Sequence, residues 1–168
     1  AACRQFEVET SGTVMDACPL IADALRWVAV PQVRSRGTVV GSLIQANAGG
    51  EMPVVARTLD ADLIVLDEGG EPSKIDAFSL YATASGTTLP PLTLAVGAEF
   101  PVLGNGDLWA FEEIQLRPAH VAIACAAVVL HVKNGKVHSA RIGIGGLTSN
   151  PYRATDAEAF LMGVSLED

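Results

Sequence analysis

Residues 37–53, GTVVGSLIQANAGGEMP, have the types and spacing expected of a binding site for a small polar ligand. Glycine has no Cβ, so the backbone amides beside Gly37 and Gly41 could approach a ligand closely. The hydroxyl groups of Thr38 and Ser42 stand in the same run, and amides and hydroxyls together suit phosphates or the polar edge of a ring. The run matches neither a P-loop nor GxGxxG, and turns in a chain with 16 glycines are the alternative interpretation.

Glu51 is the only charged residue in this segment. It follows a glycine pair and stands just before a proline that favours the start of a helix. A carboxylate at this place could accept hydrogen bonds from ligand hydroxyls, such as those of a ribose or a ribityl chain. It could equally be an acid that complements the positive end of a helix dipole, without any ligand. The residues leave both interpretations open.

The histidines indicate no metal site and no catalytic pair. His131 and His138 flank the turn Asn134-Gly135 and could face each other, but no third ligand accompanies them. His120 precedes a strand-like run, and no spacing pairs it with a serine or cysteine nucleophile. We therefore predict no metal ion, and the residues leave any catalytic role unknown.

The cysteines, Cys3, Cys18 and Cys125, lack the CxxC or CxxH spacing of metal and redox motifs. Reduced and mostly buried thiols are expected, which favours a cytoplasmic protein. The opening residues AACRQFEVET carry no basic-then-apolar secretion signal. No window has the ~18 apolar residues that a transmembrane helix needs.

Composition favours an ordered globular chain and disfavours some partners. Of the 168 residues, 49% are hydrophobic, which is enough for a well-buried core. The 19 acidic residues outnumber the 11 basic ones and give a net charge of -8, so binding to nucleic acid or to an anionic membrane surface is not expected. Aromatic residues make up only 5%, which leaves no stacking platform for bases.

The first part of the chain has the pattern of helices followed by strands. Apolar residues at helical spacing predict a helix over residues 18–29, with Asp16 as its N-cap and Pro31 as its end. The run EGGEP between two strand-like runs predicts a hairpin over residues 60–75. The other predicted elements are a short strand with a glycine loop (33–46), a helix begun by Pro53 (52–61), loops (76–81 and 83–91) and a strand (92–102).

The second part, after a linker-like run at residues 101–107, has the pattern of an antiparallel sheet. Strand-like runs fill residues 109–146, and Asn134-Gly135 is a strong signal for a two-residue hairpin turn. Glu112 and Glu113 would lie on opposite faces of a strand, so that at least one of them meets solvent.

A final helix is predicted over residues 154–163, with Thr155 at its cap, Glu158 three residues later and Gly163 beyond its end. Together these patterns predict an α+β fold. They divide the chain into one domain at residues 1–101 and a smaller sheet-and-helix domain at residues 107–168.

Several of these motifs occur together, in the same order, in a known family. The main stretch is residues 19–53, PLIADALRWVAVPQVRSRGTVVGSLIQANAGGEMP, preceded by AACRQFE and followed by WAFEEIQLRP, VAIACAAVVL and ARIGIGGLTSNPYRATDAEAFLMG. The chain resembles the FAD-binding medium subunit of molybdenum hydroxylases, which is the flavoprotein of carbon monoxide dehydrogenase and its xanthine dehydrogenase-like relatives. The resemblance covers nearly the whole chain and implies a flavin-binding middle domain followed by a C-terminal α+β domain.

This resemblance implies that the chain binds FAD and transfers electrons. In the family, a loop like residues 38–42 lies against the flavin and its ribityl chain. An acid matching Glu51 holds the ribityl or phosphate region, and a leucine matching Leu89 packs on the isoalloxazine. The implied partners are iron–sulfur and molybdopterin subunits, which deliver electrons from a molybdenum site. The implied cofactor-binding residues are Gly37, Thr38, Val39, Val40, Gly41, Ser42, Asn47, Glu51 and Leu89.

The chain also departs from the family pattern. Val40 stands where the family has glycine, and its branched side chain would take up room beside the cofactor. Asn47 replaces an aspartate, and residues 116–121 (LRPAHV) differ from the family's Arg-Arg-x-Gly-Asp-Phe run. The family's N-terminal subdomain, which binds the pyrophosphate, and its last helical part have no counterpart in the sequence.

Two hypotheses are compatible with these departures. The chain is an electron-transfer flavoprotein subunit, completed by further sequence or by a complementing chain. Alternatively, it is a relative that has lost FAD and serves as a small-molecule binding module or as a non-redox cyclase or isomerase.

Overall fold

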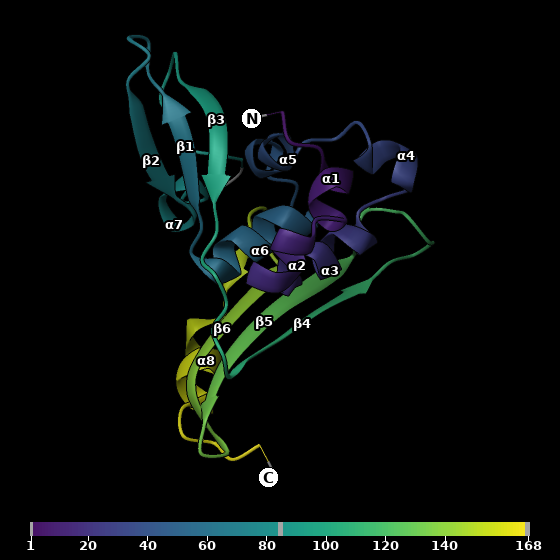
Figure 1. Cartoon of the computed structure of the whole chain (residues 1–168), viewed down its shortest axis with the longest axis vertical. Helices are drawn as coiled ribbons and strands as arrows, with labels where there is room; N and C mark the ends of the chain where they lie inside the picture. Colours follow the sequence, from purple (N-terminus) through teal and green to yellow (C-terminus); the bar gives the residue numbers. More distant parts are fainter. Residues whose placement is uncertain (1, 84–85, 167–168) are drawn as a thin grey trace.

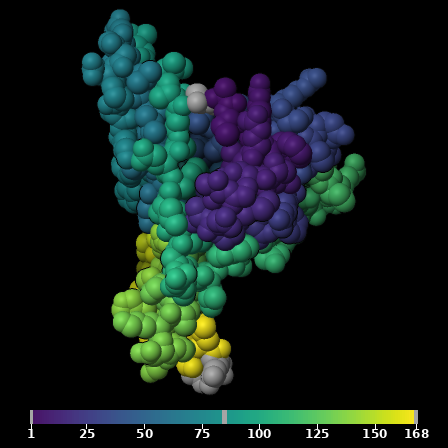
Figure 2. Space-filling view, in the orientation of Figure 1, coloured from purple at the N-terminus to yellow at the C-terminus, as the bar shows by residue number. Residues whose placement is uncertain are grey.

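The computed structural model describes residues 2–83 and 86–166 and has the α+β architecture expected from the sequence. A body of short helices lies beside a small sheet and against one face of a longer sheet (Figure 1). Figure 2 shows that the far end of the longer sheet projects from this body as a narrower lobe. The helices of the body are α1 (Gln5–Glu9), α2 (Gly12–Ala17), α3 (Pro19–Trp27), α4 (Pro31–Arg34), α5 (Val39–Gln45) and α6 (Glu51–Leu59).

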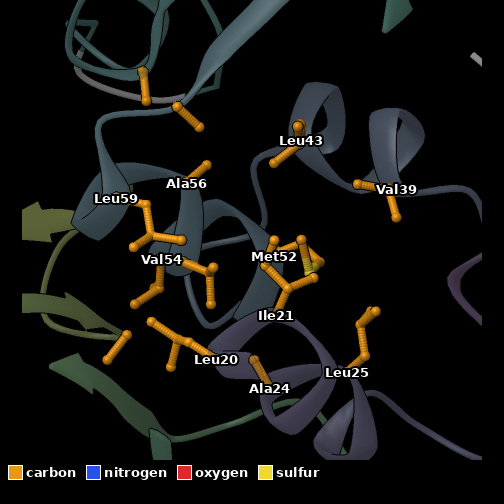
Figure 3. Close-up of a cluster of buried hydrophobic side chains, with 14 of the residues drawn as sticks. Leu20, Ile21, Ala24, Leu25, Val39, Leu43, Met52, Val54, Ala56 and Leu59 are labelled. Carbon is orange, nitrogen blue, oxygen red and sulfur yellow. The ribbon is translucent and has the colours of Figure 1, made fainter. Parts of the chain in front are cut away.

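Helices α3 and α6 form the centre of the hydrophobic core. Leu20, Ala24 and Leu25 of α3 are fully buried, because residues three or four apart lie on the same face of a helix. Val54 of α6 is also fully buried, and Figure 3 shows the side chains of α3, α5 and α6 gathered in one cluster. The helix predicted to begin at Pro53 is confirmed, although it starts earlier, at Glu51.

The small sheet consists of β1 (Asp62–Leu66), β2 (Pro72–Asp76) and β3 (Leu94–Glu99) in the order β2-β1-β3, with antiparallel neighbours. Leu63 of β1 pairs with Ile75 of β2, so the predicted hairpin is confirmed. Leu63 and Val65 are buried, because alternate side chains of a strand face the same side.

The longer sheet consists of β4 (Asp107–Ile114), β5 (Ala124–Lys133), β6 (Lys136–Gly145) and β7 (Tyr152–Arg153), in that order and antiparallel. Asn134 and Gly135 have φ of 53° and 72°, which is the left-handed conformation that a tight hairpin turn requires. This turn was predicted from the sequence. Cys125, Ala127 and Val129 of β5 are buried and belong to the same core as α3 and α6.

The region before α6 differs from its prediction. Asp16 lies inside α2 and does not cap α3, whose N-cap is Cys18. Pro31 begins helix α4. The strand predicted within residues 33–46 is wrong, because Thr38 caps helix α5 with its side-chain oxygen.

Two helices later in the chain also refine the sequence interpretation. Residues 76–81 were predicted as a loop, but Asp76 accepts a hydrogen bond from the Ser79 amide (2.9 Å) and caps α7 (Ala77–Leu80). The final helix is confirmed as α8 (Thr155–Leu161), although Thr155 is its first residue and not its cap. Glu158 does not form a capping box, and its carboxylate instead accepts from the Ile142 amide at 2.7 Å.

Candidate functional site

A cleft of about 290 Å³ opens beside the start of α6 and brings several predicted site residues together. Ser42 on α5, Asn47 in the following turn and Glu51 at the start of α6 all line it. The chain can turn between the two helices because Ala46 adopts a left-handed conformation (φ 47°) that ends α5. Residues 119–121, which follow β4, form another wall of the cleft.

The glycines of the predicted loop contact the chain's own side chains. A Cβ on Gly37 would lie 2.6 Å from the Gln5 Oε1 atom, and a Cβ on Gly41 would lie 2.6 Å from the Thr38 Oγ1 atom. Both distances are shorter than real Cβ contacts, so a side chain at either position would displace the Gln5 amide or the Thr38 hydroxyl from the place it occupies here. The sequence suggested that the backbone at these glycines approaches a ligand. In the structure, the backbone at Gly37 approaches the Gln5 side chain and the backbone at Gly41 approaches the Thr38 side chain, and the cleft lies next to Gly37.

Ser42 is tied to the N-terminal segment by a hydrogen bond. The Gln5 side-chain amide donates to the Ser42 Oγ atom at 2.6 Å. Gln5 is only 3% exposed, so its polar end is removed from water and depends on such a partner. This contact fixes Ser42 at the edge of the cleft.

Glu51 is an acid in a partly desolvated place. Burial raises the pKa of Glu51 to about 7, and the negative charge of Glu113 adds to this rise. A carboxyl group near half-protonation at neutral pH can donate as well as accept a hydrogen bond. Glu51 also lies in the first turn of α6, where a negative charge interacts favourably with the helix dipole. Both roles considered for this residue are thus compatible with its position.

Glu113, on β4, lines a separate hollow together with Trp27 and Gln115, and only 9% of its surface is exposed. Gln115 donates a hydrogen bond to the Glu113 Oε1 atom at 2.5 Å. The Oε2 atom is buried and has no hydrogen-bond partner within the described part of the chain. Burial also raises the pKa of Glu113. The neighbouring Glu112 is exposed, so the predicted alternation of these acids is confirmed.

The wall formed by residues 119–121 is held in place by Gln115 and Gly49. The Ala119 amide donates to the Gln115 Oε1 atom at 3.0 Å, and the Gln115 Nε2 atom donates to the Trp27 carbonyl oxygen at 3.3 Å. A Cβ on Gly49 would lie 2.6 Å from the Ala122 carbonyl oxygen, so only glycine permits this approach. The wall carries His120 to the cleft.

The remaining predicted site residues lie elsewhere. Val39 and Val40 are 7% and 8% exposed and line a separate apolar cavity of about 370 Å³ between the first helices and β3. Leu89 is half-buried against the hydrophobic core and is not among the residues that line the cleft. The structure therefore gathers four of the predicted site residues at the cleft, namely Gly37, Ser42, Asn47 and Glu51. It leaves the other five outside the cleft lining, namely Thr38, Val39, Val40, Gly41 and Leu89.

Several cleft residues were missed in the sequence. Gln5, Gln45 and residues 119–121 line the cleft, and Glu113 and Gln115 support it. They lie in or beside stretches that carry the family resemblance, but none of them except His120 was considered for a role, and only tertiary contacts bring them to the site. The one local signal was the glycine at position 37, whose missing side chain makes room for Gln5.

The cysteines and histidines play no part in this cleft apart from His120. The three thiols are free, with Cys18 and Cys125 buried and Cys3 exposed. His131 and His138 do face each other, with ring centroids 5.9 Å apart. Within residues 2–83 and 86–166, no group of three or more potential ligands could hold a metal ion. No helix among these residues is long and apolar enough to cross a membrane.

The sequence is similar to those of subunits of known enzyme complexes. The α subunit of the 6-hydroxypseudooxynicotine dehydrogenase complex from Paenarthrobacter nicotinovorans is 35% identical over 99% of this chain and 56% of its own length. The carbon monoxide dehydrogenase medium chain of Afipia carboxidovorans is 31% identical over 89% of this chain and 51% of its own length. The chain thus spans about half the length of these relatives.

Solved structures show the same fold. A carbon monoxide dehydrogenase chain from Hydrogenophaga pseudoflava superposes with a TM-score of 0.92 and 27% identity, over 97% of this chain and 56% of that one. Quinoline 2-oxidoreductase from Pseudomonas putida 86 gives a TM-score of 0.88 and 30% identity, over 97% and 56%.

Two family profiles, one for each part of the chain, together match nearly all of its residues. The profile of the FAD binding domain in molybdopterin dehydrogenase matches residues 1–103. The profile of the CO dehydrogenase flavoprotein C-terminal domain matches residues 109–168. This chain therefore belongs to the family of FAD-binding medium subunits of molybdopterin dehydrogenases.

Proposed function

We propose that this chain is part of an FAD-binding electron-transfer subunit of a molybdenum hydroxylase-type oxidoreductase. The observation that carries the proposal is the cleft between α5, α6 and residues 119–121, which gathers Ser42, Asn47 and Glu51 from the part of the chain that matches the FAD-binding profile. FAD, when bound, would supply the exchange of electrons.

The cleft suits the flavin and ribityl part of FAD. Ligand pockets commonly have volumes of roughly 300–1,000 Å³. A volume of about 290 Å³ is at the lower limit, so the cleft has room for part of a dinucleotide and not for all of it. No lysine or arginine of the described chain lines the cleft, so the pyrophosphate needs donors from another segment or another chain. This charge pattern supports a position of the neutral part of FAD, rather than its pyrophosphate, at the cleft.

Each polar residue has a binding role in this arrangement. The Ser42 hydroxyl and the Asn47 amide offer hydrogen bonds to the polar edge of the ring or to ribityl hydroxyls. Glu51 can accept a hydrogen bond as a carboxylate and donate one in its protonated form. Val28 and Met52 provide apolar contact with the ring and exclude water.

The partners we propose are an iron–sulfur subunit and a molybdopterin subunit. The relatives are described as the subunit of a complex and as a medium chain, which supports a multi-subunit assembly. A further proposed partner is a complementing chain that supplies the hydrogen-bond donors for the pyrophosphate of FAD. Electrons would then pass through FAD in this subunit to an external acceptor.

The test is a flavin titration of the purified full gene product. We expect bound FAD in the absorbance spectrum. After the bound FAD has been removed, we expect the fluorescence of added FAD or riboflavin to be quenched by the protein. ADP should not compete with riboflavin for the cleft.

Ser42→Ala should weaken riboflavin binding roughly three- to tenfold, as expected for one neutral hydrogen bond. Ser35→Ala, at an exposed serine outside the cleft, should leave it unchanged. A colourless protein that takes up neither FAD nor riboflavin would support the FAD-free relative instead.

A further inference from the structure

Resting on the proposed function, we propose that Gln5 is a positioning residue of the cleft. Its side-chain amide orients the Ser42 hydroxyl so that the hydroxyl proton is free for the ligand. The inference rests on one contact between two helices. The Gln5 side chain of α1 lies next to Gly37 and donates a hydrogen bond to the Ser42 Oγ atom of α5 at 2.6 Å.

The backbone holds Gln5 at this place. The Gln5 amide donates to the Gly37 carbonyl oxygen at 2.9 Å, and the Val39 amide donates to the Cys3 carbonyl oxygen at 3.2 Å. Arg4 and Thr38 form an antiparallel bridge between these two hydrogen bonds. The start of α1 and the start of α5 are therefore connected by backbone contacts before any side chain is considered.

Gly37 permits the side chain to reach Ser42. A side chain at position 37 would push the Gln5 amide from its present place, since a Cβ there would lie 2.6 Å from Oε1 and 3.1 Å from the amide carbon. Gln5 is 3% exposed, so this polar group is buried in a fixed position. A buried amide that donates to a hydroxyl group restricts the rotation of that hydroxyl more than water does, because it cannot exchange or reorient freely.

The direction of the hydrogen bond decides the role of Ser42. The amide NH₂ group can only donate, so the Ser42 oxygen accepts from it and keeps its own proton for another acceptor. The pyrimidine edge of a flavin carries two carbonyl oxygens and the N1 nitrogen, which accept hydrogen bonds, beside an N3–H group that donates one. Gln5 thereby makes Ser42 a donor toward the cleft and favours ligands that present an acceptor there.

The test reverses the polarity of this contact with a near-isosteric substitution. In Gln5→Glu the carboxylate can only accept, so it captures the Ser42 proton and withdraws it from the ligand. In Gln5→Met the hydroxyl is left without a partner and can rotate. We expect the dissociation constant of the full gene product for riboflavin, measured by fluorescence quenching, to rise about threefold in Gln5→Met and about tenfold in Gln5→Glu.

Two controls separate positioning from a structural role or a charge effect. In the Ser42→Ala background, both changes at Gln5 should alter the dissociation constant less than about twofold, because the hydroxyl on which they act is gone. Gln32→Glu adds the same charge at an exposed glutamine of α4 and should leave binding unchanged. The midpoint of thermal unfolding shows whether each variant is folded.

The outcomes distinguish this inference from the proposed function. If the unmodified protein binds no flavin, the proposed function fails and the inference fails with it. If the unmodified protein binds riboflavin while Gln5→Glu binds equally well, or if the effects at Gln5 and Ser42 are additive, only the role of Gln5 is overturned. Should Gln5→Glu not fold, Gln5→Met and its double variant with Ser42→Ala decide the question.

Discussion

Glu51 of α6 and Glu113 of β4 are two acids that interact electrostatically, and burial raises the pKa of both. Carboxylates with little water around them resist ionisation, and a neighbouring negative charge increases this resistance. Gln115 is the only residue whose side chain is seen to donate to Glu113 within the described chain. The site therefore retains a proton near neutral pH, which a fully exposed pair of glutamates would not do.

This pair makes stability depend on pH. Between pH 4.5 and 7, folded Glu51 holds a proton that the unfolded chain has lost. The free energy of unfolding therefore falls as pH rises through this window, by up to about 3 kcal/mol from Glu51, and Glu113 acts in the same direction. We expect Glu51→Gln to be more stable than the unmodified protein at about pH 8 and similar to it at about pH 5, in urea unfolding without added flavin.

Glu112→Gln is the matched control for this prediction. Glu112 is the exposed neighbour of Glu113 on the same strand, so its neutralisation should leave the pH dependence unchanged. A Glu51→Gln variant whose stability still falls with pH as steeply as that of the unmodified protein would show that Glu51 ionises normally.

At the residue scale, three of the residues predicted to bind the cofactor lie in one short segment and line the same cleft. Ser42, Asn47 and Glu51 lie within residues 42–51, from α5 to the first turn of α6, and were proposed from residue type or from the family resemblance of this stretch. Gln5 and Gln115 were not predicted, because their partners lie on other elements. A glutamine far along the chain carries no pattern that marks it as a partner of Ser42 or of the Trp27 carbonyl.

At the scale of elements, the clearest difference from prediction is α5. Adjacent β-branched valines suggested a strand, and a short apolar run does not distinguish a strand from a buried helix. The Thr38 side chain, which accepts from the Gly41 amide at 3.1 Å, decides the outcome by capping a helix. The hairpins were predicted correctly because Asn134-Gly135 and the EGGEP turn specify local backbone geometry.

The packing of α6 on β6 depends on Gly143. A Cβ on Gly143 would lie 2.1 Å from the Thr58 Oγ1 atom and 3.0 Å from the Val54 carbonyl oxygen. The Thr58 hydroxyl cannot easily move, since Thr58 is fully buried and donates to that same carbonyl at 2.8 Å. We expect Gly143→Ala to lower the free energy of unfolding by about 1–3 kcal/mol in urea, because it forces the helix away from the sheet.

Gly12→Ala is the control for this effect. No atom lies within 4 Å of a Cβ built at Gly12, which is the first residue of α2. Alanine there should leave stability unchanged or raise it by up to about 1 kcal/mol through helix propensity. Equal losses in both variants would indicate a general cost of replacing glycine and would contradict a specific role for Gly143 in helix–sheet packing.

At the scale of the whole molecule, the helices and the longer sheet share one core. Phe111 of β4 and Val129 of β5 belong to the same buried cluster as Leu20 of α3 and Val54 of α6. Arg153 of β7 adds a polar connection, since it donates to the Arg57 carbonyl oxygen at 2.8 Å. The division at residues 101–107 was predicted from composition, which shows a linker but cannot show what packs across it.

A shared core predicts that both parts of the chain unfold together. The chain has 2 tryptophans, and one lies in each part, Trp27 on α3 and Trp109 on β4. In Trp27→Phe the fluorescence reports only on β4, and in Trp109→Phe only on α3. In each variant we expect the guanidinium midpoint from fluorescence to coincide with that from far-ultraviolet circular dichroism, because one cooperative transition exposes one core. If Trp109 instead reported a transition at lower denaturant than Trp27, with a two-step dichroism curve, the longer sheet would be an independent unit and the cleft wall at residues 119–121 would be free to separate from α6.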